Sequence, residues 1–159
     1  MVGAAHTLDM EKEEHMLQLL VVTPTQLCKC CLRDMYKRGS GKILNVASVG
    51  AFQPGPYTAS YYASKSYLYQ YSQAIRLEAK KQGVQVCTLC PGSTRTHFFE
   101  KTGAKTPIWA MSPERVAKEA WEGLNADKAV VVPGMINRLL RLVPAQIKAY
   151  GVALLKKHT

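Results

Sequence analysis

Three short, continuous apolar runs recur along this chain, and longer stretches with helical spacing separate them. The runs cover residues 42–48, 84–90 and 129–132. A strand that is apolar at nearly every position is buried on both faces, and such strands are typical of parallel sheets covered by helices. Because helical stretches alternate with these strands, we predict an α/β fold built on a doubly wound parallel sheet.

Helices are predicted between the strands from apolar spacing and from start and stop signals. They cover residues 10–37, 59–82 and 113–124, and an interrupted helical tail covers residues 135–159. Asp9 can cap the first helix, and Ser112 followed by Pro113 is a good start for the third. Pro24 should bend or break the first helix, because proline lacks the N–H group of the helical ladder.

The composition is typical of a soluble globular domain, with 47% hydrophobic and 20% charged residues. No run approaches the roughly 18 apolar residues of a spanning helix, so none is expected. The first residues have neither a basic flank nor a long apolar stretch, and no signal peptide is expected. Five cysteines are an odd number and too few for a disulfide scaffold, which predicts a reducing compartment and a cytoplasmic location.

The cysteines could also suggest a metal site, because Cys87 and Cys90 have C-x-x-C spacing and Cys28, Cys30 and Cys31 lie upstream. A structural zinc site needs four thiolate or imidazole ligands that converge on the metal. Alternation along a strand would point Cys87 and Cys90 to opposite faces, and the upstream trio lies in a helical stretch without turn glycines. We therefore expect no metal site and interpret the cysteines as small buried hydrophobes.

One constellation of polar residues suits proton transfer. Tyr61 and Lys65 are four residues apart on a predicted helix and therefore share a face. Ser48 ends the preceding strand, at the carboxyl edge of the sheet where ligands bind in this class of fold. A nearby ammonium group favours the phenolate and should lower the pKa of Tyr61 toward the working range. Ser48 could then hold a substrate oxygen while Tyr61 exchanges its proton.

Three segments together resemble the short-chain dehydrogenase/reductase family. They are Ile43-Leu44-Asn45-Val46-Ala47-Ser48, Tyr61-x-x-x-Lys65, and Cys90-Pro91-Gly92-Ser93-Thr94-Arg95-Thr96. Their order and spacing are similar to the catalytic strand, the catalytic helix and the Pro-Gly turn beside the nicotinamide in that family. The resemblance implies a partial Rossmann-like sheet with three C-terminal strands. It also implies an oxidoreductase that transfers hydride between NAD(P)H and a carbonyl or alcohol substrate.

The family pattern also implies a role for each matching position. Ser48, Tyr61 and Lys65 would be catalytic, with Tyr61 as general acid and base. The cofactor-binding residues would be Tyr61, Lys65, Pro91, Gly92, Thr94 and Thr96. The substrate-lining residues would be Phe52, Tyr57, His97 and Phe98. The expected cofactor is NAD(P)H, with NADPH slightly favoured, and the apolar segment after Thr96 would suit a hydrophobic carbonyl compound.

Two departures from the family pattern qualify this expectation. The sequence contains no Gly-rich βαβ unit, so the pyrophosphate and adenosine sites of the cofactor are missing. We expect residues 1–134 to be a truncated catalytic half that is weakly active or inactive alone. Leu20 stands where the family often has an asparagine of the proton relay, and leucine cannot donate or accept a hydrogen bond. The alternative is therefore a non-catalytic interaction or dimerisation module derived from the family.

The sequence also predicts self-association and an uneven distribution of charge. A homo-oligomer is expected through the helices at 10–37 and 59–82 or through the exposed sheet edge near Ile43, Leu44 and Val46. Six of the basic residues and no acidic one lie in residues 128–159, so this part of the chain holds +6 of the net charge of +10 and includes a basic, apolar tail at 135–159. No nucleic-acid motif accompanies this charge, and no nucleic-acid partner is expected. The tail should pack on the substrate lid or a partner chain, and peripheral contact with an anionic membrane surface is the alternative.

Overall fold

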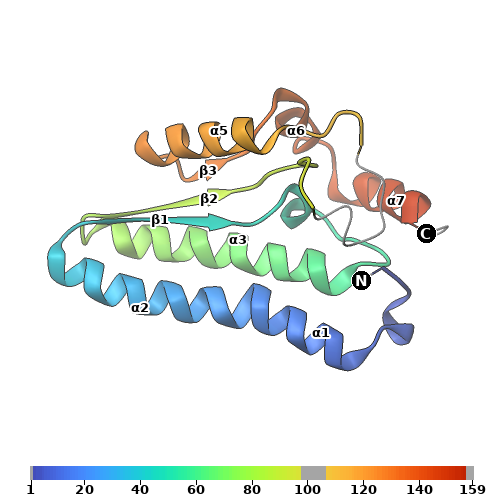
Figure 1. The fold of residues 1–159 in the computed structure, drawn as a ribbon, viewed down its shortest axis with the longest axis horizontal. Helices are drawn as coiled ribbons and strands as arrows, with labels where there is room; N and C mark the ends of the chain where they lie inside the picture. The colour runs from blue at the N-terminus through green and yellow to red at the C-terminus, as the bar shows by residue number, and fades with distance from the viewer. Residues whose placement is uncertain (1, 98–106, 157–159) are drawn as a thin grey trace.

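A three-stranded parallel sheet forms the centre of the structure, which is a computed structural model that describes residues 2–97 and 107–156. Strands β1 (Gly41–Val46), β2 (Val84–Leu89) and β3 (Val130–Val131) lie in the order β1-β2-β3 (Figure 1). Gly41 pairs with Val84 and Val46 with Leu89, while Leu89 pairs with Val131 on its other side. The predicted parallel α/β sheet is therefore confirmed, although each strand is shorter than its apolar run.

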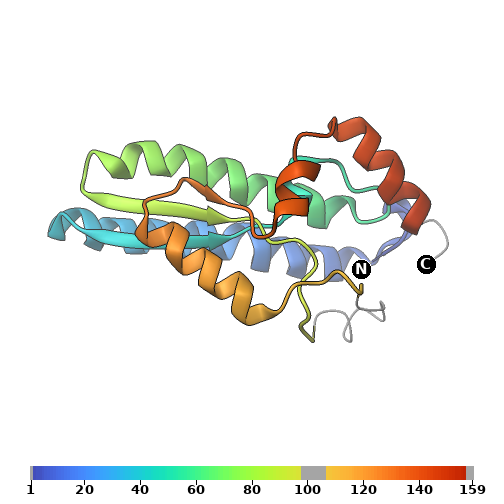
Figure 2. The same cartoon turned by 90° about the horizontal axis from the view of Figure 1, so that it is seen from above.

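Helices cover both faces of the sheet. One face carries α1 (Met10–Leu17), α2 (Thr23–Arg38) and α3 (Ala59–Lys80), and the other carries α5 (Pro113–Asn125), as Figures 1 and 2 show. Short 3-10 helices occur at Ala5–Thr7 and Val49–Phe52. Two more helices, α6 (Met135–Leu140) and α7 (Ala145–Lys156), follow β3 and lie at the carboxyl end of the strands.

The single helix predicted over residues 10–37 is interrupted in the structure. Asp9 caps α1, as expected, by accepting a hydrogen bond from the Lys12 backbone N–H at 2.9 Å. A π-helical segment, Gln18–Val22, then separates α1 from α2. Pro24 lies directly after this segment and lacks the N–H group that would bond the Leu20 carbonyl in an α-helix, which explains why regular helix is lost there.

Polar groups buried between the sheet and α3 are hydrogen-bonded, which fixes how the helix lies on the strands. The Asn45 amide of β1 donates to Ser72 Oγ at 2.8 Å, and Gln73 donates to Thr88 Oγ1 of β2 at 2.9 Å. Arg76 donates to the Val86 carbonyl at 2.7 Å and forms an ion pair with Asp127 at 2.8 Å. Because a buried polar group without a partner is costly, these bonds favour a single placement of α3.

Candidate active site

Strands β1 and β2 end side by side. Ser48, which follows β1, therefore lies next to the Pro91-Gly92 turn, which follows β2. Backbone pairing continues past both strands, since Ala47 N–H donates to the Leu89 carbonyl at 2.8 Å and Val49 N–H to the Pro91 carbonyl at 3.0 Å. The Ser48 hydroxyl accepts a hydrogen bond from Gly50 N–H at 3.1 Å and thereby caps the 3-10 helix Val49–Phe52. Ser48 is thus held at the carboxyl edge of the sheet, where the topology predicts a ligand site.

Tyr61 and Lys65 face this edge from the first turns of α3. The Ser48 side chain lies close enough to the Tyr61 phenol to lower the pKa of that phenol. Lys65 Nζ lies 5.9 Å from the centroid of the Tyr61 ring and donates to the Val46 carbonyl at the end of β1, at 3.0 Å. The structure therefore brings together all three residues that the sequence predicted for proton transfer, and both Tyr61 and Lys65 are half-buried.

The electrostatics of the site differ from the expectation in one respect. Burial raises the pKa of Tyr61 above its ordinary value, and the hydrogen bond from Ser48 opposes this rise only in part. Burial also lowers the pKa of Lys65. Desolvation therefore favours the neutral phenol of Tyr61 and the neutral amine of Lys65. The pKa of Tyr61 is therefore raised in this structure and not lowered as the sequence predicted, because burial is the largest cause of its shift.

The segment after β2 turns back across the carboxyl edge of the sheet. Thr94 Oγ1 donates to the Gly92 carbonyl at 3.1 Å, and Met111 N–H donates to the Ser93 carbonyl at 2.9 Å. Pro91, Gly92 and Thr94 are half-buried at this edge, whereas Thr96 is exposed. Of the six predicted cofactor-binding residues, five therefore lie at the same edge as Ser48, and Thr96 lies further along the exposed segment.

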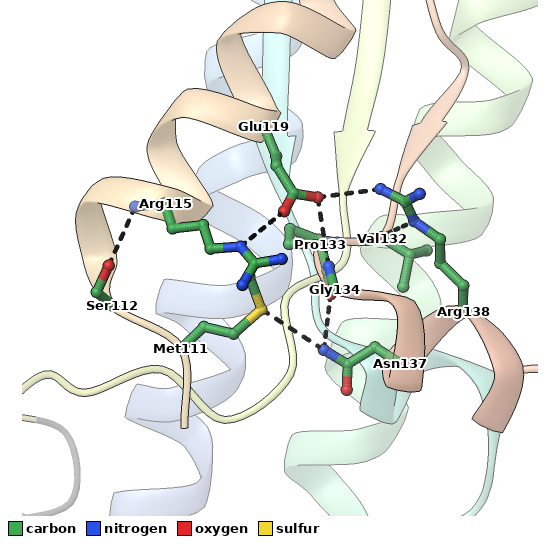
Figure 3. A network of polar contacts seen from close by, with 9 residues as sticks. All are labelled: Met111, Ser112, Arg115, Glu119, Val132, Pro133, Gly134, Asn137 and Arg138. Atoms are coloured by element: carbon green, nitrogen blue, oxygen red, sulfur yellow. Dashed lines mark hydrogen bonds and ion pairs between the residues drawn. The ribbon is translucent and has the colours of Figure 1, made fainter. Parts of the chain in front are cut away.

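A polar network supports this turn from the side of α6 (Figure 3). Glu119 accepts hydrogen bonds from Arg138 at 3.0 Å and from Gly134 N–H at 3.3 Å, which ties α5 to the start of α6. Asn137 donates to the Pro133 carbonyl at 2.7 Å. A Cβ atom on Gly92 would lie 2.5 Å from Asn137 Oδ1, so the turn and α6 are packed as closely as a glycine allows.

The four predicted substrate-lining residues lie in different surroundings. Phe52 packs edge-on against Tyr69, at 5.1 Å between ring centroids, and Arg141 covers its other side at 4.7 Å. Tyr57 is half-buried in a turn with a φ of 62°, and its carbonyl accepts from Gly3 N–H at 2.8 Å. His97 is exposed, and Phe98 lies outside the described residues.

Sequence reasoning missed a cavity of about 530 Å³ beside the neighbouring tyrosine, Tyr62. It lies between the N-terminal part of α3 and the Gly/Pro loop before it. The lining residues are Gln53, Pro54, Gly55, Pro56, Ala59, Tyr62, Ala63 and Ser66. The signal that could have found it is the helical spacing of Ala59, Tyr62 and Ser66 beneath a loop too rich in proline and glycine to fill the space with side chains.

The cysteines occupy separate places in the fold. Cys87 and Cys90 belong to different core clusters, and burial raises the pKa of the Cys90 thiol to about 12. Cys28 is buried against Asn45 of β1, while Cys30 and Cys31 are exposed. Within residues 2–97 and 107–156, no group of three or more His, Cys, Asp or Glu side chains could hold a metal ion.

Comparisons with known proteins agree with this geometry. A family model described as short chain dehydrogenase matches residues 1–107. A 3-ketodihydrosphingosine reductase from Bacteroides thetaiotaomicron is 35% identical over 100 residues, which are 62% of this chain and 37% of the relative. A 7beta-hydroxysteroid dehydrogenase from Clostridium sardiniense is 27% identical over 140 residues, or 86% of this chain and 53% of the relative. This chain thus spans about half or less of the length of these relatives.

A solved structure supports the same assignment at the level of the fold. The short-chain dehydrogenase from Sphingobium yanoikuyae in complex with NADPH superposes with a TM-score of 0.80 and 24% identity, over 94% of this chain and 60% of that protein. The family model covers well over half of the chain, including β1, α3 and β2 with Ser48, Tyr61 and Lys65. The chain therefore belongs to the short-chain dehydrogenase family.

Proposed function

We propose that this chain carries the catalytic site of an NAD(P)H-dependent oxidoreductase that interconverts a carbonyl compound and an alcohol. The observation that carries the proposal is the placement of Ser48, Tyr61 and Lys65 together at the carboxyl edge of the sheet, with the Lys65 amine 5.9 Å from the centroid of the Tyr61 ring and bonded to the Val46 carbonyl. A hydroxyl, a phenol and an amine converge there from two elements. Such a set can hold an oxygen atom and deliver a proton to it.

Each residue has a distinct part in the proposed reaction. Ser48 donates a hydrogen bond to the substrate carbonyl oxygen and orients it. Tyr61 gives its proton to the same oxygen as the carbonyl becomes an alcohol, and in the reverse direction it takes the proton back. Because burial raises the pKa of Tyr61, the phenol is fully protonated at neutral pH and is ready to act as the acid in carbonyl reduction. Lys65 supports the charge that develops on the phenol oxygen.

The donors and backbone groups at this edge fit a nicotinamide nucleotide. The Lys65 amine has three N–H donors and gives one of them to the Val46 carbonyl, so a further N–H can reach a ribose hydroxyl. Pro91, Gly92 and Thr94 present half-buried backbone next to it, where the flat face of a nicotinamide could lie. When bound, the nicotinamide cofactor would supply the hydride of the reaction.

The substrate class proposed here is a hydrophobic carbonyl compound, with NADPH favoured over NADH. Two relatives are named for a 3-ketodihydrosphingosine and a 7beta-hydroxysteroid, and both names describe apolar skeletons. The structural neighbour from Sphingobium yanoikuyae holds NADPH. We further propose that residues 1–134 form the catalytic part and residues 135–159 a separate helical tail, in a cytoplasmic protein.

Self-association is part of the proposal as well. On the outer sides of the long helices, Leu27 of α2 is 60% exposed and Leu77 of α3 is 71% exposed. Val46 at the end of edge strand β1 is 49% exposed, whereas Ile43 and Leu44 are half-buried against the core clusters. Two copies could bury the helix surfaces or the sheet edge, which are the two modes of association predicted from the sequence.

A non-catalytic interaction module remains the second candidate, and Leu20 is the observation that favours it. Leu20 lies in the π-helical segment Gln18–Val22, and its side chain offers no hydrogen bond to a proton relay. The backbone weakens this objection, because Pro24 cannot donate to the Leu20 carbonyl in the way a residue four positions later normally does. A carbonyl at that position could hold a water molecule, and the side chain would then be dispensable.

Cofactor binding tests the proposed function. Titration of the chain with NADPH, followed by cofactor fluorescence, should give saturable binding in the millimolar range, since the sequence lacks a Gly-rich phosphate turn. Lys65→Met should weaken this binding by about tenfold, because it removes a charge-assisted hydrogen bond. Lys80→Met is the matched control, since Lys80 is an exposed lysine in the last turn of the same helix. Absence of binding at millimolar NADPH, or equal weakening by both variants, would contradict the proposal.

A further inference from the structure

Helix α7 turns an apolar side toward solvent. Its outward positions recur at the spacing of one helix face, and they carry Ile147, Tyr150, Leu154 and Leu155, which are 62%, 76%, 73% and 80% exposed. None of its twelve residues is buried. A helix on the surface of a globular protein normally hides its large apolar residues against the core, and α7 leaves these four exposed.

Two lysines of α7 reach the protein body. Lys148 Nζ lies 3.5 Å from the Phe52 carbonyl, and Lys156 Nζ lies 2.9 Å from Thr58 Oγ1 and 5.2 Å from the centroid of the Tyr62 ring. Both lysines are half-buried against the loop that precedes α3. The two lysines therefore hold α7 against the protein body, and the apolar side chains on its outer side remain exposed.

Helix α6, which precedes α7, also exposes large apolar side chains. Five large apolar residues between positions 135 and 142 are at least half exposed, and α6 and α7 lie together at one end of the molecule (Figures 1 and 2). These residues are Met135, Ile136, Leu139, Leu140 and Leu142. Single exposed apolar residues are ordinary, but this many within two short consecutive helices indicate a docking surface.

The charge of the tail decides between the possible occupants. Residues 135–156 contain four basic residues and no acidic one, so two copies of this surface would repel each other. An anionic lipid surface offers hydrocarbon for the exposed apolar side chains and phosphate groups for the flanking cations. Arg138 of α6 and Arg141, which follows it, are exposed. Each guanidinium has more N–H donors than the ones it gives to Glu119 or Tyr69, so both could also reach such phosphates.

We propose that α6 and α7 dock this protein on the surface of an anionic lipid bilayer. With twelve residues, α7 is about 18 Å long, which is too short to cross the hydrocarbon core. In agreement, no helix within residues 2–97 and 107–156 is long and apolar enough to span a membrane. The helix therefore lies in the plane of the interface, with Ile147 and Leu154 inserted and Tyr150 at headgroup depth.

Vesicle flotation with the full chain tests this inference independently of catalysis. Vesicles of two parts phosphatidylcholine and one part phosphatidylserine should carry the protein to the top of the gradient, and pure phosphatidylcholine should carry far less. The double variant Ile147→Ser/Leu154→Ser should reduce the partition coefficient by about tenfold or more, because two inserted side chains are lost. Both residues are exposed, so the thermal unfolding midpoint should remain that of the parent chain.

A matched control exists on α5. Trp121 is 66% exposed, between the exposed fractions of Ile147 and Leu154, so Trp121→Ser removes a large apolar side chain of the same exposure outside α6 and α7. This control should float like the parent. The inference is overturned if the parent does not float, if it floats equally on both vesicle types, or if Trp121→Ser loses binding as much as Ile147→Ser/Leu154→Ser. It is also overturned if Ile147→Ser/Leu154→Ser instead dissociates an oligomer in lipid-free sedimentation.

Discussion

Replacing Tyr61 by phenylalanine should lower turnover of a carbonyl substrate by about a thousandfold, within the range that a positioned general acid contributes. The variant removes one oxygen atom and keeps the ring, so the packing of α3 on the sheet is retained. The phenol oxygen beside Ser48 and Lys65 is lost. Steady-state consumption of NADPH with a hydrophobic ketone measures the effect.

Tyr62→Phe is the control for that experiment. Tyr62 is the next residue on the same helix, its ring lies 5.9 Å from that of Tyr61, and burial raises its pKa as well. Its side chain lines the cavity under the Gly/Pro loop, and the Lys156 amine lies 5.2 Å from the centroid of its ring. Turnover by Tyr62→Phe should stay within a few-fold of the parent. Similar losses in the two variants, or an unchanged rate in Tyr61→Phe, would contradict the assignment of Tyr61.

The largest loss of stability is expected from Gly83→Ala, at about 3 kcal/mol of unfolding free energy. Gly83 precedes β2 with a φ of 72°, a conformation that costs an L-residue about 1–2 kcal/mol. An added Cβ atom would also overlap the Gly39 carbonyl oxygen, and this backbone group cannot rotate away. Overpacking of this kind adds about 1–3 kcal/mol. Urea unfolding of the variant and the parent measures the difference.

Gly39→Ala separates the two contributions. Gly39 has nearly the same backbone conformation, with a φ of 67°, but no atom lies within 4 Å of its added Cβ. This variant should lose only about 1 kcal/mol, the cost of the left-handed conformation alone. Equal losses at Gly39 and Gly83 would show that the close approach of the two turns, which sets the start of β1 beside the start of β2, has no part in stability.

The order and type of the main elements could be predicted from the sequence, because each rests on a local signal. Continuous apolar runs indicated β1, β2 and β3, and the Ser112-Pro113 pair indicated the start of α5, where Ser112 indeed accepts from Arg115 N–H at 3.3 Å. Strand β3 contains only Val130 and Val131 of the predicted run 129–132, because only Thr88 and Leu89 of β2 pair with it. Strand length depends on the partner strand, which a local apolar pattern does not contain.

Other features depend on tertiary packing and were beyond local signals. The sequence places a tyrosine above a lysine, but the balance between charge attraction and burial at Tyr61 depends on how deeply α3 is covered. The helical tail was recognisable, yet its spacing alone does not tell which face meets the protein. Lys148 and Lys156 determine that face by reaching Phe52 and Thr58, residues about a hundred positions earlier in the chain.

Transfer of a label from the cofactor tests whether Tyr61 delivers a proton during hydride transfer to a ketone. The chain is incubated at millimolar concentration of NADPH that carries deuterium at the hydride position, together with a hydrophobic ketone, and the alcohol is analysed by mass spectrometry. We expect deuterium on the carbinol carbon with the parent chain and with Tyr62→Phe, and only background label with Tyr61→Phe. Unlabelled alcohol, no alcohol from the parent, or equal labelling by the parent and Tyr61→Phe would contradict this expectation.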